Sequence, residues 1–432
     1  MSEAAKVLTQ PSIPTAKTAN SQGFTGYQKF VVALLAFLQF TIILDFMILS
    51  PLGAMLMPAL AITPSQFGLV VSVYAFSAGA SGILAAGFAD RFDRKRMLLF
   101  FYIGFLAGTL LCALATSYPA LIFARIVTGI FGGVIGSIVF AITTDLFPFS
   151  MRGRVMGFVQ TAFAASQVLG IPLGIYLSNA WGWHAPFMMI VAIGAVVGLI
   201  IFRYLKPIDG HLAAKVDRNA FHHLWTTARS PRYLQGFATT ALMAVGGFML
   251  MPFGSAYSIH NLGVDINDLP HVYMVTGICA IAAGPLVGRL SDAVGKFRMF
   301  LFGTILTIIM VAIYTNLGVT PLPLVMLVNA LLFVGITARM IPSQALMSAI
   351  PEQSSRGSYM AISASIQQMA GGVASVIAGH IVEAHADGSI GYFNRIGYVV
   401  TLASLFTLFM MSRIHRLIPE QRPANVGIGA SH

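Results

Sequence analysis

Long runs of apolar residues, separated by short polar segments, follow one another along almost the whole chain. About 20 consecutive apolar residues allow an α-helix to cross the hydrocarbon core of a bilayer. The pattern therefore predicts an all-α membrane protein with twelve transmembrane helices. The predicted spans are 30–57, 66–89, 97–115, 119–146, 154–178, 184–205, 233–258, 269–290, 297–317, 321–349, 357–381 and 393–414.

Polar segments group these spans into larger units. The opening segment lacks the apolar core of about 7 to 15 residues that a signal peptide carries, so we expect a retained cytoplasmic tail. The longest internal polar segment separates six spans from the next six. The predicted units are an N-terminal tail (1–29), a six-helix bundle (30–205), a cytoplasmic linker (206–232), a second six-helix bundle (233–414) and a cytoplasmic C-terminal tail (415–432).

The linker contains apolar residues at helical spacing, namely Phe221, Leu224, Trp225 and Ala228. This spacing favours a short helix lying on the membrane surface. A solvated linker without such a helix is the alternative.

Composition excludes an ordinary soluble protein. Apolar residues make up 57% of the chain and charged residues only 9%, against about 25% charged residues in typical soluble domains. Cys112 and Cys279 both fall inside apolar spans, where we expect them to pack as small side chains rather than to form a disulfide or bind a metal.

The basic residues are unevenly distributed between the loops. With a cytoplasmic N-terminus, 22 of the 25 Lys and Arg residues fall in cytoplasmic segments, which is the positive-inside pattern. We therefore expect both termini on the cytoplasmic side of a bacterial inner membrane. The net charge of +11 then reflects topology and contact with anionic lipid, since no separate basic domain is present to bind nucleic acid.

The two halves of the chain resemble each other. "AAGFADRFDRKRMLLF" follows the second span and "LVGRLSDAVGKFRMFL" follows the eighth, and Asp90 aligns with Asp292. Arg152 and Gly153 similarly recur as Arg356 and Gly357. A duplicated six-helix unit explains both matches, and many secondary transporters place their substrate site between two such repeats.

At these residues the chain resembles the major facilitator superfamily, over essentially its whole length. "AGFADRFDRK" is similar to that family's cytoplasmic signature G-x-x-x-D-[RK]-x-G-[RK]-[RK], and "LIFARIVTGIFGG" is similar to its R-x-x-x-G motif through Arg125 and Gly129. "GIPLGIYLSNAWGWHAPF" resembles the signature of the arabinose and purine-nucleoside efflux permeases, near the twelve-span drug/proton antiporters. The resemblance implies two six-helix halves, and a link between Arg125 and proton coupling.

A cytoplasmic gate is predicted from the repeated charges. Asp90 ends a helix and can meet the positive N-terminal end of a helix from the other half, which would latch the halves together. Arg94 and Arg152 are candidates to pair with Asp145. Screened surface charges are the alternative interpretation. The residues assigned to the gate are Asp90, Arg91, Arg94, Asp145, Arg152, Asp292 and Arg356.

Three full charges fall well within the spans, namely Asp45, Arg125 and Arg339. Such charges usually face a cavity or one another. Asp45, midway along its predicted span, is expected to bind a proton or contact substrate, with a permanent ion pair as the alternative. Arg125 is either part of proton coupling or a tie to a neighbouring helix, and Arg339 either lines the cavity or reaches toward the membrane surface.

Neutral polar residues extend this candidate site. The duplication places Asn329 at the position equivalent to Arg125, and Gln160 and Gln167 share one face of the fifth span. Gln368 lies on a polar face of the eleventh span. In the fifth span Gly170, Pro172 and Gly174 are a candidate bend for gating.

These features together predict an alternating-access transporter that exports a small organic molecule, such as a sugar, nucleoside or drug-like compound, in exchange for protons. An importer or uniporter of a sugar, organic anion or lipid is the alternative. Motifs of metal-dependent hydrolases, serine hydrolases and ATPases are missing from the sequence, so we expect neither an enzyme nor a metal or other cofactor. We expect a monomer in the lipid bilayer. Substrate charge stays open, because one acid and two arginines do not decide it.

Overall fold

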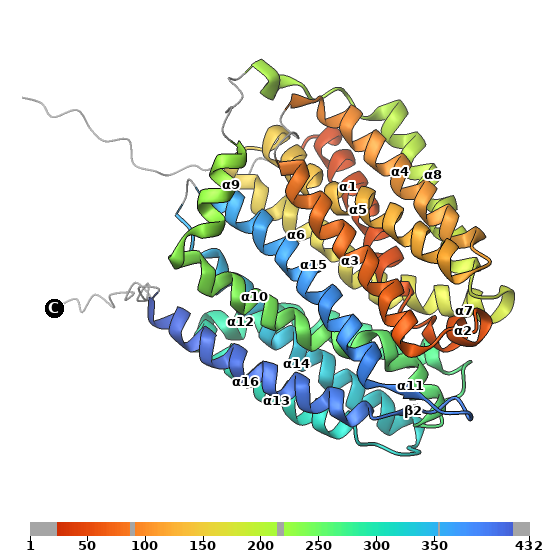
Figure 1. Cartoon of the computed structure of the whole chain (residues 1–432). Helices are drawn as coiled ribbons and strands as arrows, with labels where there is room; N and C mark the ends of the chain where they lie inside the picture. The colour runs from red at the N-terminus through yellow and green to blue at the C-terminus, as the bar shows by residue number, and fades with distance from the viewer. Residues whose placement is uncertain (1–23, 87–90, 214–219, 353–354, 418–432) are drawn as a thin grey trace, which may run out of the picture.

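The structure is a computed structural model that describes residues 24–86, 91–213, 220–352 and 355–417. The chain forms a bundle of long helices that run between the same two ends (Figure 1). Within the described residues, twelve helices are long and apolar enough to cross a membrane, which confirms the predicted fold class. Asp90 of the predicted gate lies outside the described residues, as do most of both predicted tails.

The first half of the chain contributes six spans. Its elements are α1 (Gly26–Ile48), α2 (Gly53–Ala59), α3 (Pro64–Ala86), α4 (Arg94–Leu114), α5 (Tyr118–Leu146), α6 (Phe149–Ala165), the π-helix η2 (Ser166–Gly170), α7 (Ile171–Trp181) and α8 (Ala185–Tyr204). The fifth span consists of α6, η2 and α7 together.

The second half contributes the other six, preceded by a linker that carries two short helices. Its elements are η3 (Gly210–Ala213), α9 (Ala220–Arg229), α10 (Pro231–Leu250), η4 (Met251–Phe253), α11 (Gly254–His260), α12 (Leu269–Val294), α13 (Lys296–Tyr314), α14 (Leu322–Ser348), α15 (Arg356–Ile381), β1 (Glu383–Ala384), β2 (Ile390–Gly391) and α16 (Phe393–Leu417). The antiparallel hairpin of β1 and β2 is an addition to the predicted all-α pattern.

The first span is shorter than predicted. The apolar run continues to residue 57, but α1 ends at Ile48 and a separate short helix begins at Gly53. Pro51 explains the break, because proline disfavours helical conformation in the residue before it. Asp45 consequently lies in the last turn of α1, so its expected position midway along the span is wrong.

The fifth span changes its helical register at Pro172. Proline has no backbone N–H and its ring would clash with the carbonyl four residues earlier, and the chain responds with the π-helix η2 just before α7. The seventh span is broken in a similar way by η4, which contains Pro252. Both interruptions lie in spans that line the interface between the halves.

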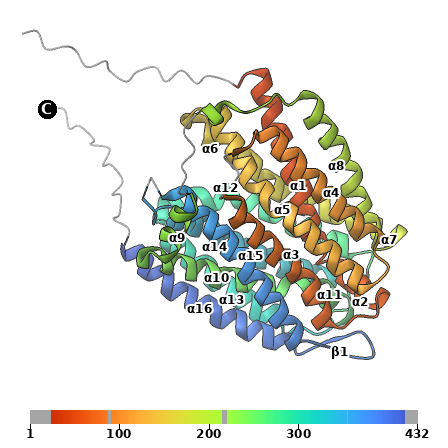
Figure 2. The same ribbon diagram turned by 45° about the horizontal axis from the view of Figure 1, so that its top comes forward.

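The two ends of the bundle differ in charge. One, which we call the basic end, carries α9 and the start of α4 with Arg94, Lys95 and Arg96 (Figure 1). The other, which we call the far end, carries α2, α11 and the β-hairpin (Figure 2), with acidic residues such as Asp265 of a loop and Glu383 of the hairpin.

The apolar cores show which end is closed. At the far end one continuous cluster contains buried residues of both halves, for example Leu52 and Phe67 of the first half and Phe253 and Val272 of the second. At the basic end each half has its own clusters: one joins α1, α4, α5 and α8, and another joins α10, α13, α15 and α16. The halves are therefore packed together at the far end and have separate cores at the basic end.

Polar contacts also join the halves at the far end. Ser255 donates to the Ser50 carbonyl over 3.0 Å, and Ser50 donates to the Met251 carbonyl. Asn179 donates to the Ile266 carbonyl over 3.0 Å. These three contacts bridge loop and helix ends that are distant in sequence, so closure of the far end involves more than apolar packing.

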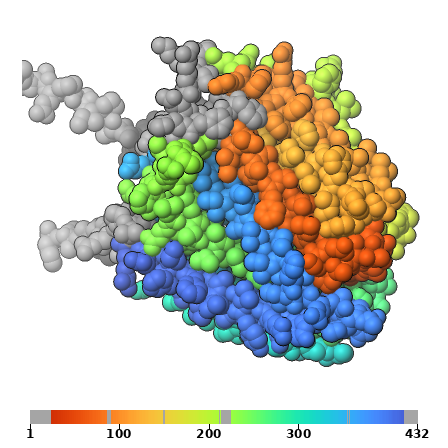
Figure 3. Space-filling view, in the orientation of Figure 1, coloured from red at the N-terminus to blue at the C-terminus, as the bar shows by residue number. Residues whose placement is uncertain are grey.

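Helices α3 and α15 form the most visible seam between the halves (Figure 3). Ser72 of α3 donates to the Gly372 carbonyl of α15 over 2.8 Å. Close approach depends on glycines: a Cβ at Gly68 would lie 2.6 Å from the Ser375 carbonyl oxygen, and one at Gly379 would lie 2.8 Å from the Pro64 carbonyl oxygen. Side chains at these positions would force the two helices apart.

The predicted linker helix is present as α9. Leu224 packs into the basic-end core of the second half, whereas Trp225 is 57% exposed. The Arg229 guanidinium carbon lies 4.1 Å from the centre of the Trp225 ring. The exposed face of α9 thus combines an aromatic ring and a cation, the residue types that favour a membrane surface.

Candidate functional site: a buried ion pair beside a cavity between the halves

Asp45 and Arg125 form an ion pair inside the first half. Nη1 of Arg125 donates to Oδ2 of Asp45 over 2.8 Å, and both side chains are 0% exposed. Thr109 of α4 donates to Oδ1 of Asp45 over 3.0 Å. Three helices therefore meet at one carboxylate, and each of its oxygens accepts a hydrogen bond.

The pair lies within the apolar core that closes the far end. Leu44 and Ile48 flank Asp45 in that core, and Leu121 and Ala124 flank Arg125. Arg125 Nε and Nη2 are buried without a hydrogen-bond partner. A buried pair with unsatisfied donors is an expensive structure, because the desolvation of two ions is only partly offset by their attraction.

An aromatic chain separates the pair from the interface between the halves. The Arg125 guanidinium carbon lies 4.4 Å from the centre of the Tyr74 ring, a cation–π distance. The Tyr74 ring centre is 5.3 Å from that of Phe46, which in turn is 5.6 Å from Phe248 of the second half. The ion pair is thus connected through two rings of the first half to a ring of the other half.

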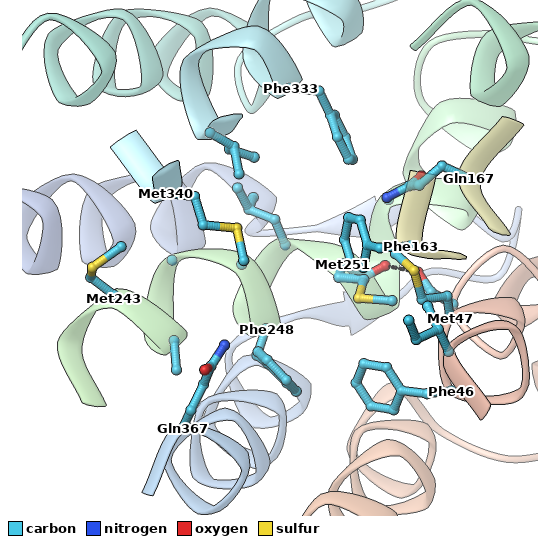
Figure 4. A pocket seen from close by; sticks show the side chains of 18 of the residues that line it. Phe46, Met47, Phe163, Gln167, Met243, Phe248, Met251, Phe333, Met340 and Gln367 are labelled. Atoms are coloured by element: carbon cyan, nitrogen blue, oxygen red, sulfur yellow. Dashed lines mark hydrogen bonds between the residues drawn. The ribbon is translucent and has the colours of Figure 1, made fainter. Parts of the chain in front are cut away.

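A cavity of about 620 Å³ lies between the halves. Figure 4 shows Phe46, Met47, Phe163 and Gln167 of the first half pointing into the cavity opposite side chains of the second half. The labelled side chains from the second half are Met243, Phe248, Met251, Phe333, Met340 and Gln367. A mostly apolar wall with a few amides is typical of a site for a small organic ligand.

Five of the seven residues predicted for coupling or substrate contact line this cavity. They are Gln160, Gln167, Asn329, Arg339 and Gln368. Asp45 and Arg125, the other two, are absent from the lining, although Tyr74, which contacts Arg125, is part of it. The structure therefore divides the predicted site into a cavity and a separate ion pair behind its wall.

Arg339 remains inside the second half. Its Nη1 donates to Ser404 of α16 over 3.1 Å, and the residue is 5% exposed. Asn329, at the position equivalent to Arg125, donates to the Val325 carbonyl of its own helix over 3.0 Å. The repeat equivalents therefore differ in role, since Arg125 holds an acid and Asn329 faces the cavity.

The described gate residues are tied within their own halves. Arg94 Nε lies 3.0 Å from Asp145 Oδ2, as predicted from the sequence. Arg152 donates to the Phe147 and Thr144 carbonyls over 2.9 and 2.7 Å, so it caps the end of α5. This arrangement stabilises the basic end of the first half.

The gate residues predicted in the second half, Asp292 and Arg356, form no described contact with the first half. Asp292 lies 3.3 Å from Lys296 one turn along the chain, and both side chains are exposed, so this pair contributes little. Arg91 is exposed, and α15 begins at Arg356, whose side chain lies outside the described part. With Asp90 also outside it, the latch between the halves stays a prediction.

Two of the three predicted bend residues have a packing role. A Cβ at Gly170 would lie 2.6 Å from Leu44 Cδ1, and one at Gly174 would lie 2.5 Å from Ile48 Cδ1. These glycines let the fifth span approach α1 beside Asp45. Pro172 accompanies the change from η2 to α7, which is a feature associated with movable helices.

Sequence reasoning missed Thr109 and Tyr74. Thr109 is an ordinary small residue of α4 and Tyr74 an ordinary aromatic residue of α3, and nothing in their local pattern marks them. Only the packing of the helices brings Thr109 to Asp45 and Tyr74 to Arg125, because each residue is far along the chain from the charge that it contacts.

A model of the Major Facilitator Superfamily matches residues 35–378 of the chain, and a second match covers residues 236–429. The first match extends over more than half of the sequence. The chain belongs to the Major Facilitator Superfamily. Proteins of this superfamily are transporters and not enzymes, which agrees with the prediction from the sequence.

Several curated members are similar to this chain. A probable sugar efflux transporter of Mannheimia succiniciproducens is 25% identical over 256 residues, which cover 59% of this chain and 63% of that protein. Multidrug resistance protein 3 of Bacillus subtilis is 36% identical over 152 residues, covering 35% and 30%. Putative transporter AraJ of Escherichia coli is 26% identical over 235 residues, covering 54% and 58%. The chain thus matches less than two thirds of the length of each, and the resemblance to efflux members is confirmed.

Solved structures of the superfamily share the fold. A bacterial homologue of the human lysosomal transporter Spinster superposes with a TM-score of 0.74 at 16% identity, covering 93% of this chain and 100% of that one. The nucleoside transporter NupG superposes with a TM-score of 0.72 at 14% identity, covering 89% and 99%. At these identities the similarity establishes the twelve-helix fold.

Proposed function

We propose that this superfamily member exports a small organic molecule across a bacterial inner membrane in exchange for protons. The efflux names of similar proteins and the cavity between the halves support export of a small molecule. The basic end is cytoplasmic in this proposal, and so are both termini, because positively charged loops remain on the cytoplasmic side. The structure then represents the state whose cavity is closed toward the outside.

The observation that carries proton coupling is the position of the Asp45–Arg125 pair. It lies in the same apolar core that joins the two halves at the far end. When the far end opens, this core must separate, and Phe46 must leave Phe248. Water then reaches a pair that is dry in the closed state.

Hydration of the pair makes proton binding by Asp45 feasible. A protonated Asp45 no longer neutralises Arg125, and water can solvate the guanidinium only while the far end is open. When the far end closes and the cavity faces the cytoplasm, Asp45 must lose that proton for the dry pair to form again, and the proton leaves past Tyr74 into the cytoplasm-facing cavity. One proton is thereby moved inward for each cycle, and movement of one charge down 100 mV provides about 2.3 kcal/mol.

The test is transport by purified protein in proteoliposomes. Counterflow of radiolabelled sugars, nucleosides, lipophilic cations and aromatic carboxylates is measured first, with and without a pH gradient. We expect at least one class to be concentrated by the unsubstituted protein only when a gradient is present. Counterflow that is indifferent to the gradient for every transported compound would contradict proton coupling.

Asp45→Asn is the matched variant, since it keeps the side-chain size and removes the titrating group. We expect it to lose concentration of substrate against a gradient while it retains exchange at equal substrate concentrations. The double variant Asp45→Asn, Arg125→Gln controls for the unpaired guanidinium that the single substitution leaves. If either variant still concentrates substrate in response to the gradient, Asp45 has a structural role and the coupling site lies elsewhere.

A further inference from the structure

The cavity between the halves carries an unbalanced positive charge. Of the charges within the spans, Asp45 and Arg125 neutralise each other behind the cavity wall. Arg339 lines the cavity, and its described lining contains no Asp or Glu. The separation of ion pair and cavity thus answers a question that the sequence left open, since only one of the three charges faces the ligand space.

The Arg339 side chain has donors to spare. Nη1 is used by Ser404, whereas Nη2 is buried without a hydrogen-bond partner. A buried guanidinium with an unused donor is costly unless an acceptor satisfies it. The Asp and Glu residues of the second half that the structure describes lie in its loops, in the β-hairpin or near the ends of its helices, and none lines the cavity beside Arg339.

The surroundings hold the guanidinium at the wall of the cavity. A Cβ at Gly303 would lie 2.5 Å from the Arg339 backbone nitrogen, so α13 packs closely behind this point of α14. On the opposite side, α10 presents Gly246 and Gly247 to the cavity, and a Cβ at Gly246 would lie 3.8 Å from Arg339 Nη1. Because both are glycines, neither places a side chain between α10 and Arg339.

The rest of the cavity suits an apolar body. Met243, Met340, Phe248 and Phe333 point into it (Figure 4). Methionine and aromatic side chains form an adaptable apolar wall, whereas a planar guanidinium matches the two oxygens of a carboxylate. The complementary ligand has one anionic end and an aromatic or aliphatic body.

We propose that the cargo of this transporter is an amphipathic organic anion, whose carboxylate or equivalent anionic group binds Arg339 while its apolar part contacts the methionine and phenylalanine side chains. This inference rests on the proposed function, because it concerns the cargo of the same cavity. Export of such an anion is also favoured by a membrane potential that is negative inside. The cargo therefore supplies the counter-charge that the described cavity lining lacks.

The experiment compares matched pairs that differ only in charge. We titrate the purified full-length protein with two pairs of compounds: indole-3-acetate with indole-3-acetamide, and 2-naphthoate with 2-naphthamide. Binding is measured from the change in thermal stability and by isothermal titration calorimetry. We expect each carboxylate to bind about 10- to 100-fold more tightly than its amide, the range that a charge-assisted hydrogen bond provides. Equal affinity within both pairs would overturn the proposal.

Three variants assign the preference to one residue. Arg339→Gln should abolish it, and Arg339→Lys, which keeps the charge but loses the planar fork, should retain part of it. Arg298→Gln, which removes an exposed cation of the same half, should leave the full preference. If Arg339→Gln still prefers carboxylates, the anion binds elsewhere and the proposal is wrong. If Arg339→Gln does not fold, the Arg339→Lys variant provides the test. A reduced preference for carboxylates over amides in Arg339→Lys supports the proposal, and an unchanged preference contradicts it.

Counterflow separates this inference from the proposed function. Binding of carboxylates that depends on Arg339, without counterflow of any compound, would refute transport and support the anion site. Counterflow of neutral sugars or nucleosides, with no preference for carboxylates, would support transport and refute the anion site.

Discussion

Replacing Asp45 by Asn removes the carboxylate that the Arg125 guanidinium faces. The substitution loses a 2.8 Å ion pair between two side chains that are both 0% exposed. Because Arg125 Nε and Nη2 are already buried without partners, no neighbouring acceptor is in place to compensate. Breaking one side of a buried pair typically costs about 3 to 5 kcal/mol, and we expect Asp45→Asn to lower the free energy of unfolding by this amount.

A double-mutant cycle tests this reasoning. Arg125→Met should cost less than Asp45→Asn, because a buried carboxylate can bind a proton whereas a guanidinium cannot lose one. The difference should be larger at pH 5 than at pH 8. The double variant should be more stable than Asp45→Asn alone, with a coupling energy above about 2 kcal/mol.

Unfolding of the purified variants is followed by SDS titration in detergent micelles, with helical circular dichroism as the signal. Thr143→Ala is a suitable control, since Thr143 is also buried in α5 but donates to the Val139 carbonyl of its own helix. A coupling energy below about 0.5 kcal/mol would refute the argument that the pair holds these helices together.

Two further predictions concern the ends of the bundle. In a background without native cysteines, a cysteine at exposed Thr63 or Asp265 should react with an impermeant maleimide added outside cells. A cysteine at exposed Asp209 should react only after the cells are lysed. The reverse pattern of labelling would show that the basic end faces outward. Gly68→Ala should lower the thermal stability by several degrees, because its Cβ would lie 2.6 Å from a carbonyl oxygen of α15, whereas Gly284→Ala, with nothing within 4 Å of the added Cβ, should not. Equal effects of the two alanines would contradict a tight seam at the far end.

Hydropathy alone predicts the twelve spans, because backbone groups in lipid must be satisfied within helices and each span must therefore be long and apolar. It does not predict where α1 ends. Residues 49 to 57 are as apolar as those of a span, and only Pro51 marks the break that puts Asp45 in the last turn.

The candidate charges could be identified from the sequence, but their grouping could not. Asp45 and Arg125 are 80 positions apart and pair only because α1 and α5 are neighbours in the first half. Arg339 lies within an apolar span, as Arg125 does, yet it faces the cavity, whose described lining contains no Asp or Glu. Three-dimensional packing, which leaves no local trace, decides which charge is neutralised and which is offered to a ligand.

The shared core at the far end has a consequence for how such proteins diverge. In the alternating-access cycle that we propose, the far end opens as the basic end packs, so the balance between the two states depends on the difference in packing free energy between the two ends. Each change of about 1.4 kcal/mol in that difference alters the ratio of the two states tenfold. A single methyl group gained or lost at a position such as Leu52 or Phe253, remote from Arg339, is of this order. Natural selection can therefore adjust how long a transporter waits on each side of the membrane without altering what it carries.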